Sequence, residues 1–370
     1  MAIMALDHTR TFFTNIAFNP SDVTRTWPAL FLTRWLSHLC TPMFMLLAGC
    51  GACFMAARRT PASAAWFLLT RGIVLVVLEI TLVRWGWYFN VDYRQTRLQI
   101  LWAIGVSMMM LAPWVFLPPR LVGAIGLAIT LLHNLIGTAT PFGLPSWLWG
   151  PLYERGRELA IAPGFVVTIN FPVLPLFGVM AIGYALGEVF RWPETDRRRA
   201  LLIGGGACIG LFVLLRATNL YGDPLRWVTG EDATRSLMSF MALTKHPLSL
   251  LMTLSTLGIG LIWLGIVRAE RPMWRPLIVI GRAPMFFYLI HVPIIHALAF
   301  AYSLVVFGGA DWLLTSPFDR GPNDLVAAGW GFGLPGVYAW WMVVMLLTYP
   351  LCQWFADVKA RSKSPWLSYF

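Results

Sequence analysis

The sequence predicts an all-α protein, a polytopic bundle of about ten transmembrane helices. Of its 370 residues, 58% are hydrophobic and only 12% are charged, whereas soluble domains carry about 25% charged residues. Many of its 19 tryptophans lie near the ends of apolar runs, as in the aromatic belts of membrane proteins. The net charge of +11 does not indicate a nucleic-acid binder, because positively charged cytosolic loops explain it. We expect one domain over residues 1–370.

Apolar runs of membrane-spanning length, which requires about 20 residues, define nine of the expected helices. They cover residues 35–57, 65–87, 98–116, 121–139, 165–190, 200–217, 248–267, 277–307 and 335–355. The first helix is shorter, because only six residues precede Asp7. We therefore expect either a first helix truncated at its N-terminus or a true start upstream of Met1.

The loops between these helices alternate in charge. One set carries 15 of the 28 basic residues but only 5 of the 17 acidic ones. The opposite set is close to neutral. The excess of positive charge on cytosolic loops assigns the first set, together with both termini, to the cytosol. The lipid bilayer is thus the first expected partner, and a homodimer is a further expectation.

The cysteines and glycines indicate packing rather than chemistry. Five cysteines lie mostly in apolar runs, and neither their odd number nor the Cys50-Gly-Ala-Cys53 motif predicts a disulfide framework or a metal site. Two motifs have the spacing of closely packed helices: Gly183-x-x-x-Gly187 and Gly206-x-x-x-Gly210.

Ionisable residues near the outer ends of membrane helices are functional-site candidates, because they are costly there. Asp7, His8 and Arg10 end the first apolar run. Asp7 and Arg10 are three residues apart and share a helix face, so they can pair, whereas His8 points about 100° away. In this topology all six histidines lie in the middle or outer part of the bilayer. The functional interpretation is favoured for His8 and left open for His38 and His291.

Glu79 has only apolar residues three and four positions away. A carboxylate in hydrocarbon needs a partner, which must come from another helix, and His8 or Arg10 lies at a matching depth. Arg84 occupies the same outer half of the helix. A structural role for Glu79 and Arg84 and a role in a site both stay open.

Several of these residues lie in motifs that resemble a known family. The motifs are Met4-Ala-Leu-Asp-His-Thr-Arg-Thr-Phe-Phe13, Leu32-Thr-Arg-Trp-Leu-Ser-His38, Thr41-Pro-Met-Phe-Met-Leu-Leu-Ala-Gly49, Leu98-Gln-Ile-Leu-Trp-Ala-Ile-Gly-Val-Ser-Met108 and Gly281-Arg-Ala-Pro-Met-Phe-Phe-Tyr-Leu-Ile-His291. They are similar to a bacterial membrane-protein family related to heparan-α-glucosaminide N-acetyltransferase, within the membrane acyltransferase superfamily. The resemblance covers nearly the whole chain.

The resemblance implies acyl transfer from cytosolic acetyl-CoA to an extracytoplasmic acceptor, a sugar or amino sugar, across a bacterial-type inner (cytoplasmic) membrane. The superfamily has a functional histidine at the outer end of its first helix, where His8 lies. We accordingly expect His8 to be the base or nucleophile, oriented by Asp7 or Glu79. The residues expected to bind the acceptor are Arg10, His38, Arg84 and His291.

Arginines at the inner face suit the phosphates of coenzyme A, which are polyanionic. The candidates, each of which ordinary anchoring also explains, are Arg58, Arg59, Arg197, Arg198, Arg199, Arg271, Arg275 and Arg282. Two other functions stay open: a transporter of a sugar or lipid-linked intermediate, which would not need coenzyme A, and a non-catalytic membrane subunit.

Overall fold

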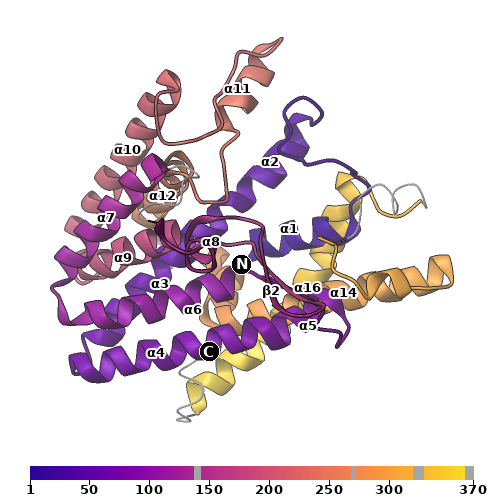
Figure 1. Ribbon diagram of the computed structural model, residues 1–370, viewed down its shortest axis with the longest axis horizontal. Coiled ribbons are helices and arrows are strands. Elements are labelled where there is room, and N and C mark those ends of the chain that lie inside the picture. Colours follow the sequence, from indigo (N-terminus) through magenta and orange to yellow (C-terminus); the bar gives the residue numbers. More distant parts are fainter. Residues whose placement is uncertain (137–142, 268–271, 320–328, 363–370) are drawn as a thin grey trace. The chain divides into compact units, whose positions relative to one another are not determined.

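The computed structural model describes residues 1–136, 143–267, 272–319 and 329–362, and it is helical apart from one small sheet (Figure 1). Six helices in this part of the chain are long and apolar enough to cross a membrane: Pro28–Ala56, Pro61–Tyr88, Pro119–Ile136, Glu194–Thr218, Pro284–Phe307 and Leu334–Arg361. Shorter apolar helices cover Ile100–Phe116, Val173–Val189 and Leu250–Ile266. The all-α polytopic fold is confirmed.

The chain forms two compact units, which are described separately. Unit 1 comprises Met1–Cys40, Thr81–Asp92 and Arg268–Phe370, and unit 2 comprises Thr41–Ile80 and Tyr93–Val267. The grouping of both units into one domain stays a prediction.

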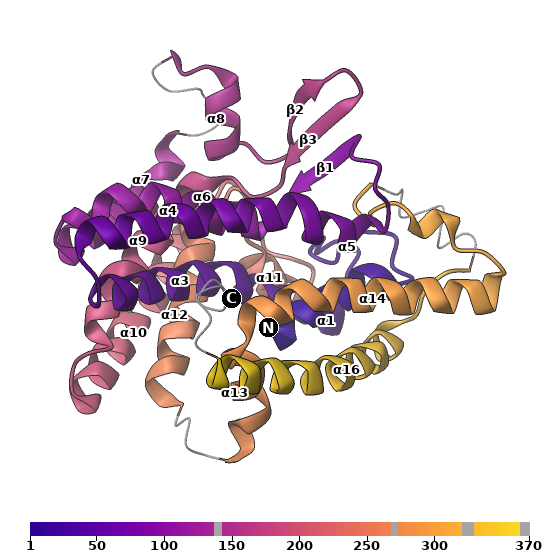
Figure 2. The ribbon, with the colours of Figure 1, turned by 90° about the horizontal axis from the view of Figure 1, so that it is seen from below.

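Unit 1 is built around the short N-terminal helix α1. Its elements are α1 (Ala2–Phe13), α2 (Pro28–Leu36), η1 (Ser37–Leu39), α5 (Arg84–Tyr88), η5 (Pro272–Trp274), α13 (Arg275–Arg282), α14 (Pro284–Phe307), η6 (Asp311–Leu313) and α16 (Leu334–Arg361). Helix α1 packs against α14 and α16 (Figure 2). Indole N–H groups hold both of its ends, because Trp341 donates to the carbonyl of Ala2 and Trp330 to that of Phe12, each at 3.0 Å.

Unit 2 consists mainly of paired helices. Its elements are α3 (Cys40–Ala56), α4 (Pro61–Leu78), the π-helical turn η2 (Glu79–Val83) at its border, β1 (Gln95–Leu98), α6 (Ile100–Leu111), η3 (Ala112–Phe116), α7 (Pro119–Ile136), α8 (Ser146–Tyr153), β2 (Arg157–Ala162), β3 (Phe165–Ile169), α9 (Val173–Val189), α10 (Glu194–Thr218), α11 (Ala233–Met241) and α12 (Leu250–Ile266). Helix α10 packs on α12, α7 on α9, and α4 on α6. In the sheet, β3 lies between β1, to which it is parallel, and β2, to which it is antiparallel.

Proline sets the start of several helices. Pro28, Pro61 and Pro284 occupy the first turns of α2, α4 and α14, where the missing N–H costs nothing. The hydroxyl of Thr60 also accepts a hydrogen bond from the backbone N–H of Ser63 and caps α4. These signals fix helix starts more sharply than hydropathy does.

Three expected helix bounds were wrong, two of them for a clear local reason. The helix expected at 165–190 begins at Val173, because the β-branched segment before it forms strand β3. The helix expected at 277–307 is divided into α13 and α14 at Ala283, whose backbone leaves the helical region before Pro284. The helix expected to begin at residue 35 begins at Pro28 instead.

Close helix packing involves one of the two expected glycine motifs. A Cβ atom at Gly183 would lie 2.1 Å from the carbonyl oxygen of Leu46, so α9 and α3 approach too closely for any side chain there. Gly206 and Gly210 face open space, and their neighbour Gly205 contacts α12 instead. The second motif therefore has the right residue type but lies on the wrong face of α10.

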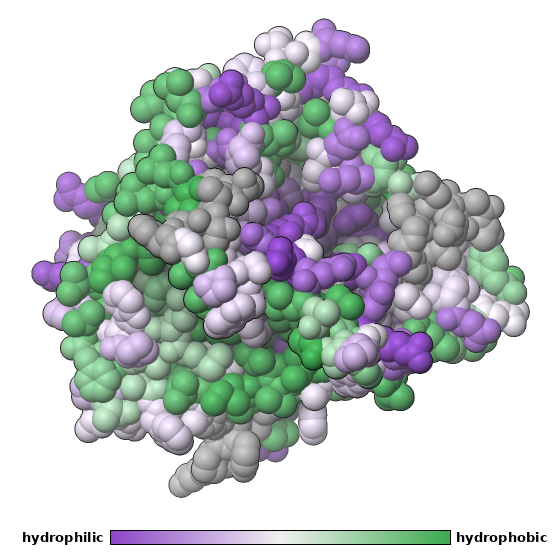
Figure 3. All heavy atoms as spheres, viewed as in Figure 1, coloured by the Kyte–Doolittle hydropathy of each residue, from purple (hydrophilic) through white to green (hydrophobic). Residues whose placement is uncertain are grey.

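The outer faces of the long helices in unit 2 are apolar. Leu127, Leu132 and Leu135 of α7 are 50%, 55% and 69% exposed, and hydrophobic side chains gather at the surface over α4 and α7 (Figure 3). Such a face suits lipid rather than water. The protein is accordingly an integral membrane protein.

Candidate functional site

His8 of α1 contacts His291 of α14, although 283 residues separate them. The Nδ1 atom of His8 lies 2.7 Å from the Nε2 atom of His291, and the two ring planes differ by 19° with centroids 5.0 Å apart. His291 is fully buried, whereas His8 is partly accessible. The two helices thus place a partly exposed imidazole edge to edge with a buried one.

The surroundings of His291 fix the position of the protons in this pair. Its Nδ1 atom lies 3.0 Å from the carbonyl oxygen of Phe287 and 2.7 Å from that of Tyr288. A nitrogen that faces carbonyl oxygens must carry the proton, so Nε2 of a neutral His291 is the acceptor. His8 then donates its Nδ1 proton to His291, and the lone pair of His8 lies on Nε2.

Aromatic rings enclose the histidine pair. Trp87 of α5 meets His8 edge-on with centroids 4.9 Å apart, and Phe12 stacks on Trp87 at 5.5 Å. Phe12 also contacts His296, whose two ring nitrogens face the backbone carbonyls of Gly86 and Leu313. These contacts give His296 a structural role and limit the access of water to one side of His8.

Asp7 is the centre of an ion cluster beside the histidine pair. Its Oδ1 atom lies 3.0 Å from Nη2 of Arg10, as the helical spacing predicts, and its Oδ2 atom lies 2.6 Å from Nη1 of Arg34. Arg34 also donates to the hydroxyl of Ser37 at 3.1 Å. Asp7 therefore binds two arginines, and its role in orienting His8 stays a prediction.

Two further residues expected to bind the acceptor lie in unit 1. His38 is buried in the short helix η1 that follows the Arg34 turn. Arg84 donates to the carbonyl of Asn90 at 2.6 Å and to the carbonyl of Asp92, and its guanidinium lies over the ring of Tyr88. These contacts hold the segment after α5 in place, which gives Arg84 a structural role. Its role in binding the acceptor stays a prediction.

Glu79 belongs to unit 2 and caps a helix there. Its Oε2 atom accepts a hydrogen bond from the backbone N–H of Trp102 at 3.1 Å, in the first turn of α6. Its Oε1 atom is buried and has no hydrogen-bond partner among the described residues. The positive end of the helix dipole explains why a carboxylate is tolerated at this place. Its role in orienting His8 stays a prediction.

The arginines expected to bind coenzyme A fall in both units. Arg58 and Arg59 are exposed in the turn between α3 and α4, and Arg59 covers the ring of Phe67. Arg198 donates to the carbonyl of Gly265 at 2.9 Å and thereby caps the end of α12. The others in the described chain, Arg197, Arg199, Arg275 and Arg282, are partly or fully exposed, and Arg271 lies outside the described residues.

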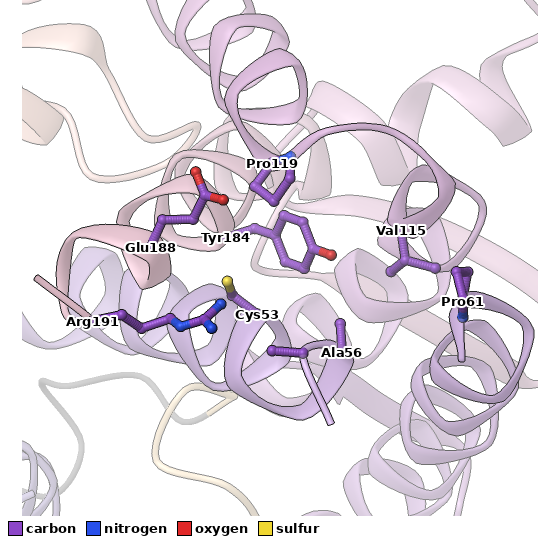
Figure 4. Close-up of a pocket in the computed structure, with 9 residues that line it drawn as sticks. Cys53, Ala56, Pro61, Val115, Pro119, Tyr184, Glu188 and Arg191 are labelled. Atoms are coloured by element: carbon purple, nitrogen blue, oxygen red, sulfur yellow. The ribbon is translucent and has the colours of Figure 1, made fainter. Parts of the chain in front are cut away.

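A pocket of about 180 Å³ opens beside the Arg58–Arg59 turn in unit 2. Its lining comes from the end of α3, the start of α4, the entry to α7 and the end of α9: Cys53, Ala56, Ala57, Pro61, Val115, Pro119, Tyr184, Glu188 and Arg191. Figure 4 shows the ring of Tyr184 between Glu188 and Val115, with the sulfur of Cys53 directed toward it. Sequence analysis missed this pocket, because its residues come from four separate segments.

The described residues contain no cluster of three or more His, Cys, Asp or Glu side chains that could hold a metal ion. The contact that sequence analysis missed at the site itself is the one between His8 and His291. Both residues were candidates, and both lie in family-like motifs, but no periodicity joins positions so far apart in the chain. The partnership of Arg34 with Asp7 was missed for the same reason.

Comparison with known proteins gave one finding. Residues 1–215 match the family model described as heparan-alpha-glucosaminide N-acetyltransferase, catalytic. The matched range contains α1 with His8, the ion cluster of Asp7, Arg10 and Arg34, Glu79 and the pocket, and it ends before His291. No curated protein gave a significant match.

Proposed function

Because the chain belongs to the heparan-alpha-glucosaminide N-acetyltransferase catalytic family, a family of membrane acetyltransferases, we propose that it transfers an acetyl group from cytosolic acetyl-CoA to an extracytoplasmic acceptor. The acceptor is a sugar or amino sugar. The contact between His8 and His291 is the observation that carries this proposal. It supplies a partly exposed imidazole whose tautomer is defined by His291 and whose ring lies against Trp87.

In the proposed reaction, Nε2 of His8 attacks the carbonyl carbon of the thioester. The carbon–sulfur bond breaks, and the coenzyme A sulfur leaves with the electron pair and takes up a proton from water. As Nε2 becomes acylated, the Nδ1 proton of His8 moves toward Nε2 of His291, which relieves the positive charge on the acylated ring. An acceptor amine or hydroxyl then attacks the acetyl carbon and gives up a proton to water. The bond between the acetyl carbon and Nε2 breaks, and the proton on His291 returns to Nδ1 of His8.

The same atoms support direct transfer without an acyl-enzyme. In that route Nε2 of His8 removes the proton from the acceptor while the acceptor attacks acetyl-CoA in a ternary complex. His291 again holds His8 in the required tautomer. Both routes make His291 a positioning residue, in place of the acceptor-binding role expected from the sequence.

The pocket beside the Arg58–Arg59 turn is the proposed binding place for part of the donor. Arg191 lines it, and the turn adds two exposed guanidinium groups. Guanidinium groups bind phosphates through paired hydrogen bonds. We assign this end of unit 2, and both termini, to the cytosol of a bacterial-type inner membrane, and we propose that both units act as one catalytic domain.

The first test uses the purified chain in lipid vesicles with acetyl-CoA labelled in its acetyl group. We expect transfer to an amino sugar, and His8→Ala should lower it by at least about 10²-fold, the usual contribution of a general base. His246→Ala, which changes a histidine outside the site, should leave it unchanged. Near-wild-type transfer by His8→Ala would contradict the assignment of His8 as base or nucleophile. Failure of the chain to bind coenzyme A would favour the transporter function over the enzyme.

The role of His291 has its own test. His291→Gln keeps a side-chain oxygen that can accept a hydrogen bond from Nδ1–H of His8 and so hold its tautomer, whereas His291→Leu does not. We expect the glutamine variant to retain about tenfold more activity than the leucine variant at equal folded fraction. Equal activities would show that His291 only fills space.

A further inference from the structure

The ion cluster around Asp7 carries more positive than negative charge. One carboxylate faces two guanidinium groups, those of Arg10 and Arg34. The side chains of Asp7, Arg10 and Arg34 are 12%, 10% and 22% exposed, so water screens them poorly. Among the described residues, no second acidic side chain pairs with either arginine.

Both guanidinium groups have donors to spare. Arg10 uses Nε and Nη2, both toward Oδ1 of Asp7, and Arg34 uses Nη1 toward Asp7 and Ser37. Within the described chain, Nη1 of Arg10 and both Nε and Nη2 of Arg34 make no hydrogen bond. A guanidinium has five N–H donors in a planar fork, so this cluster can accept one more oxyanion.

We propose that Arg10 and Arg34 bind an oxyanion, a phosphate or carboxylate group, that belongs to the acetyl acceptor. The cluster sits one residue along α1 from His8, on the neighbouring face of the helix. The charged group of the acceptor would therefore lie a short distance from the atom that receives the acetyl group. This inference rests on the proposed function and narrows the acceptor to an anionic sugar.

Charge balance is the physical reason for this assignment. A partly buried cation without a counter-ion is unfavourable, and an incoming oxyanion would complete the pairing in this cluster. Bonds between guanidinium and oxyanion are charge-assisted and often bidentate, so they also orient the ligand. Asp7 keeps both arginines in place before the acceptor arrives.

The test compares two probes that differ only in a phosphate group, glucosamine and glucosamine 6-phosphate. Their affinities for the detergent-purified chain are measured by calorimetry without acetyl-CoA. We expect the phosphorylated sugar to bind at least tenfold more tightly. Arg34→Gln should abolish that preference, Arg34→Lys should retain part of it, and Arg25→Gln, in an exposed loop of the same unit, should leave it intact.

The outcomes separate this inference from the proposed function. Equal affinities for the two sugars, or a preference that survives Arg34→Gln, would overturn it even if acetyl transfer is observed. A preference that depends on Arg34 would support an oxyanion site at Arg10 and Arg34 even if no acetyl transfer is found, and only the proposed function would then fail. A third probe, short-chain phosphatidylglycerol, tests the other source of a phosphate. Binding of this lipid that depends on Arg34, without binding of the sugar phosphate, would overturn the acceptor assignment in favour of a lipid headgroup.

Discussion

Asp7 in unit 1 is a partly buried carboxylate and Glu79 in unit 2 a fully buried one, and different partners stabilise them. Asp7 is paired with two arginine side chains, whereas Glu79 accepts a backbone N–H at the start of α6. The first arrangement leaves positive charge and free donors for a ligand. The second uses the helix dipole and supplies no cation to share. Burial of an acidic side chain in a membrane protein therefore does not by itself indicate a ligand-binding site. The kind of partner that the carboxylate has is the more informative observation.

Removal of the Asp7 carboxylate should have the largest effect on stability. Asp7→Ala leaves two partly buried guanidinium groups without their shared anion, and breaking a buried pair in this way costs about 3–5 kcal/mol. Thermal unfolding of the purified chain in detergent measures the loss. A loss below about 1 kcal/mol would mean that water screens the cluster, and the contrast with Glu79 would disappear.

A second change should restore part of that loss. Arg34→Leu in the Asp7→Ala background removes one of the two guanidinium groups that lost their carboxylate. The double variant should therefore be more stable than the sum of the two single destabilisations predicts. Residues in direct contact typically show a coupling of about 0.5–3 kcal/mol. Arg25→Leu serves as the control and should add its effect independently.

Glu79 should matter less for stability than Asp7. Glu79→Ala removes a helix cap and is expected to cost about 1–2 kcal/mol, whereas Glu79→Gln keeps an oxygen for the N–H of Trp102 and should cost less. Acetyl transfer should survive in the glutamine variant. If a folded Glu79→Gln protein has lost transfer, the carboxylate is part of the catalytic machinery, as the sequence predicted.

The smallest effect is expected at an exposed ion pair. Glu194 and Arg198 lie 3.2 Å apart on α10, and the glutamate side chain is 66% exposed. Glu194→Gln should change the free energy of unfolding by less than about 0.5 kcal/mol, and 1 M salt should reduce even that. A larger change would show that this exposed charge pair is stronger than exposed pairs in other proteins.

Hydropathy and local spacing predicted much of the fold and part of the site. Apolar runs located the long helices, and the three-residue spacing of Asp7 and Arg10 predicted their ion pair. Two errors came from signals that were present but not used: Pro284, which ends α13, and the β-branched run of strand β3. The error at Gly206 arose because one residue along a helix changes its face by about 100°.

The remaining features depend on contacts between distant segments. His8 and His291 meet only because α1 packs against α14, and Arg34 reaches Asp7 across 27 residues. The pocket of unit 2 forms from the ends of four helices. No pattern within a single helix contains this information, because it arises when the helices assemble.

The carbonyl groups that hold Nδ1 of His291 have a consequence for the catalytic cycle. In the proposed reaction, a proton that reaches Nε2 of His291 cannot continue past Nδ1, because that nitrogen already donates its proton to Phe287 and Tyr288. His291 can thus hold one proton for a time but cannot relay it to a further group. Each proton it takes up must return through His8, so every turnover ends by resetting the same pair of atoms, and the reaction moves no net proton through this part of the membrane.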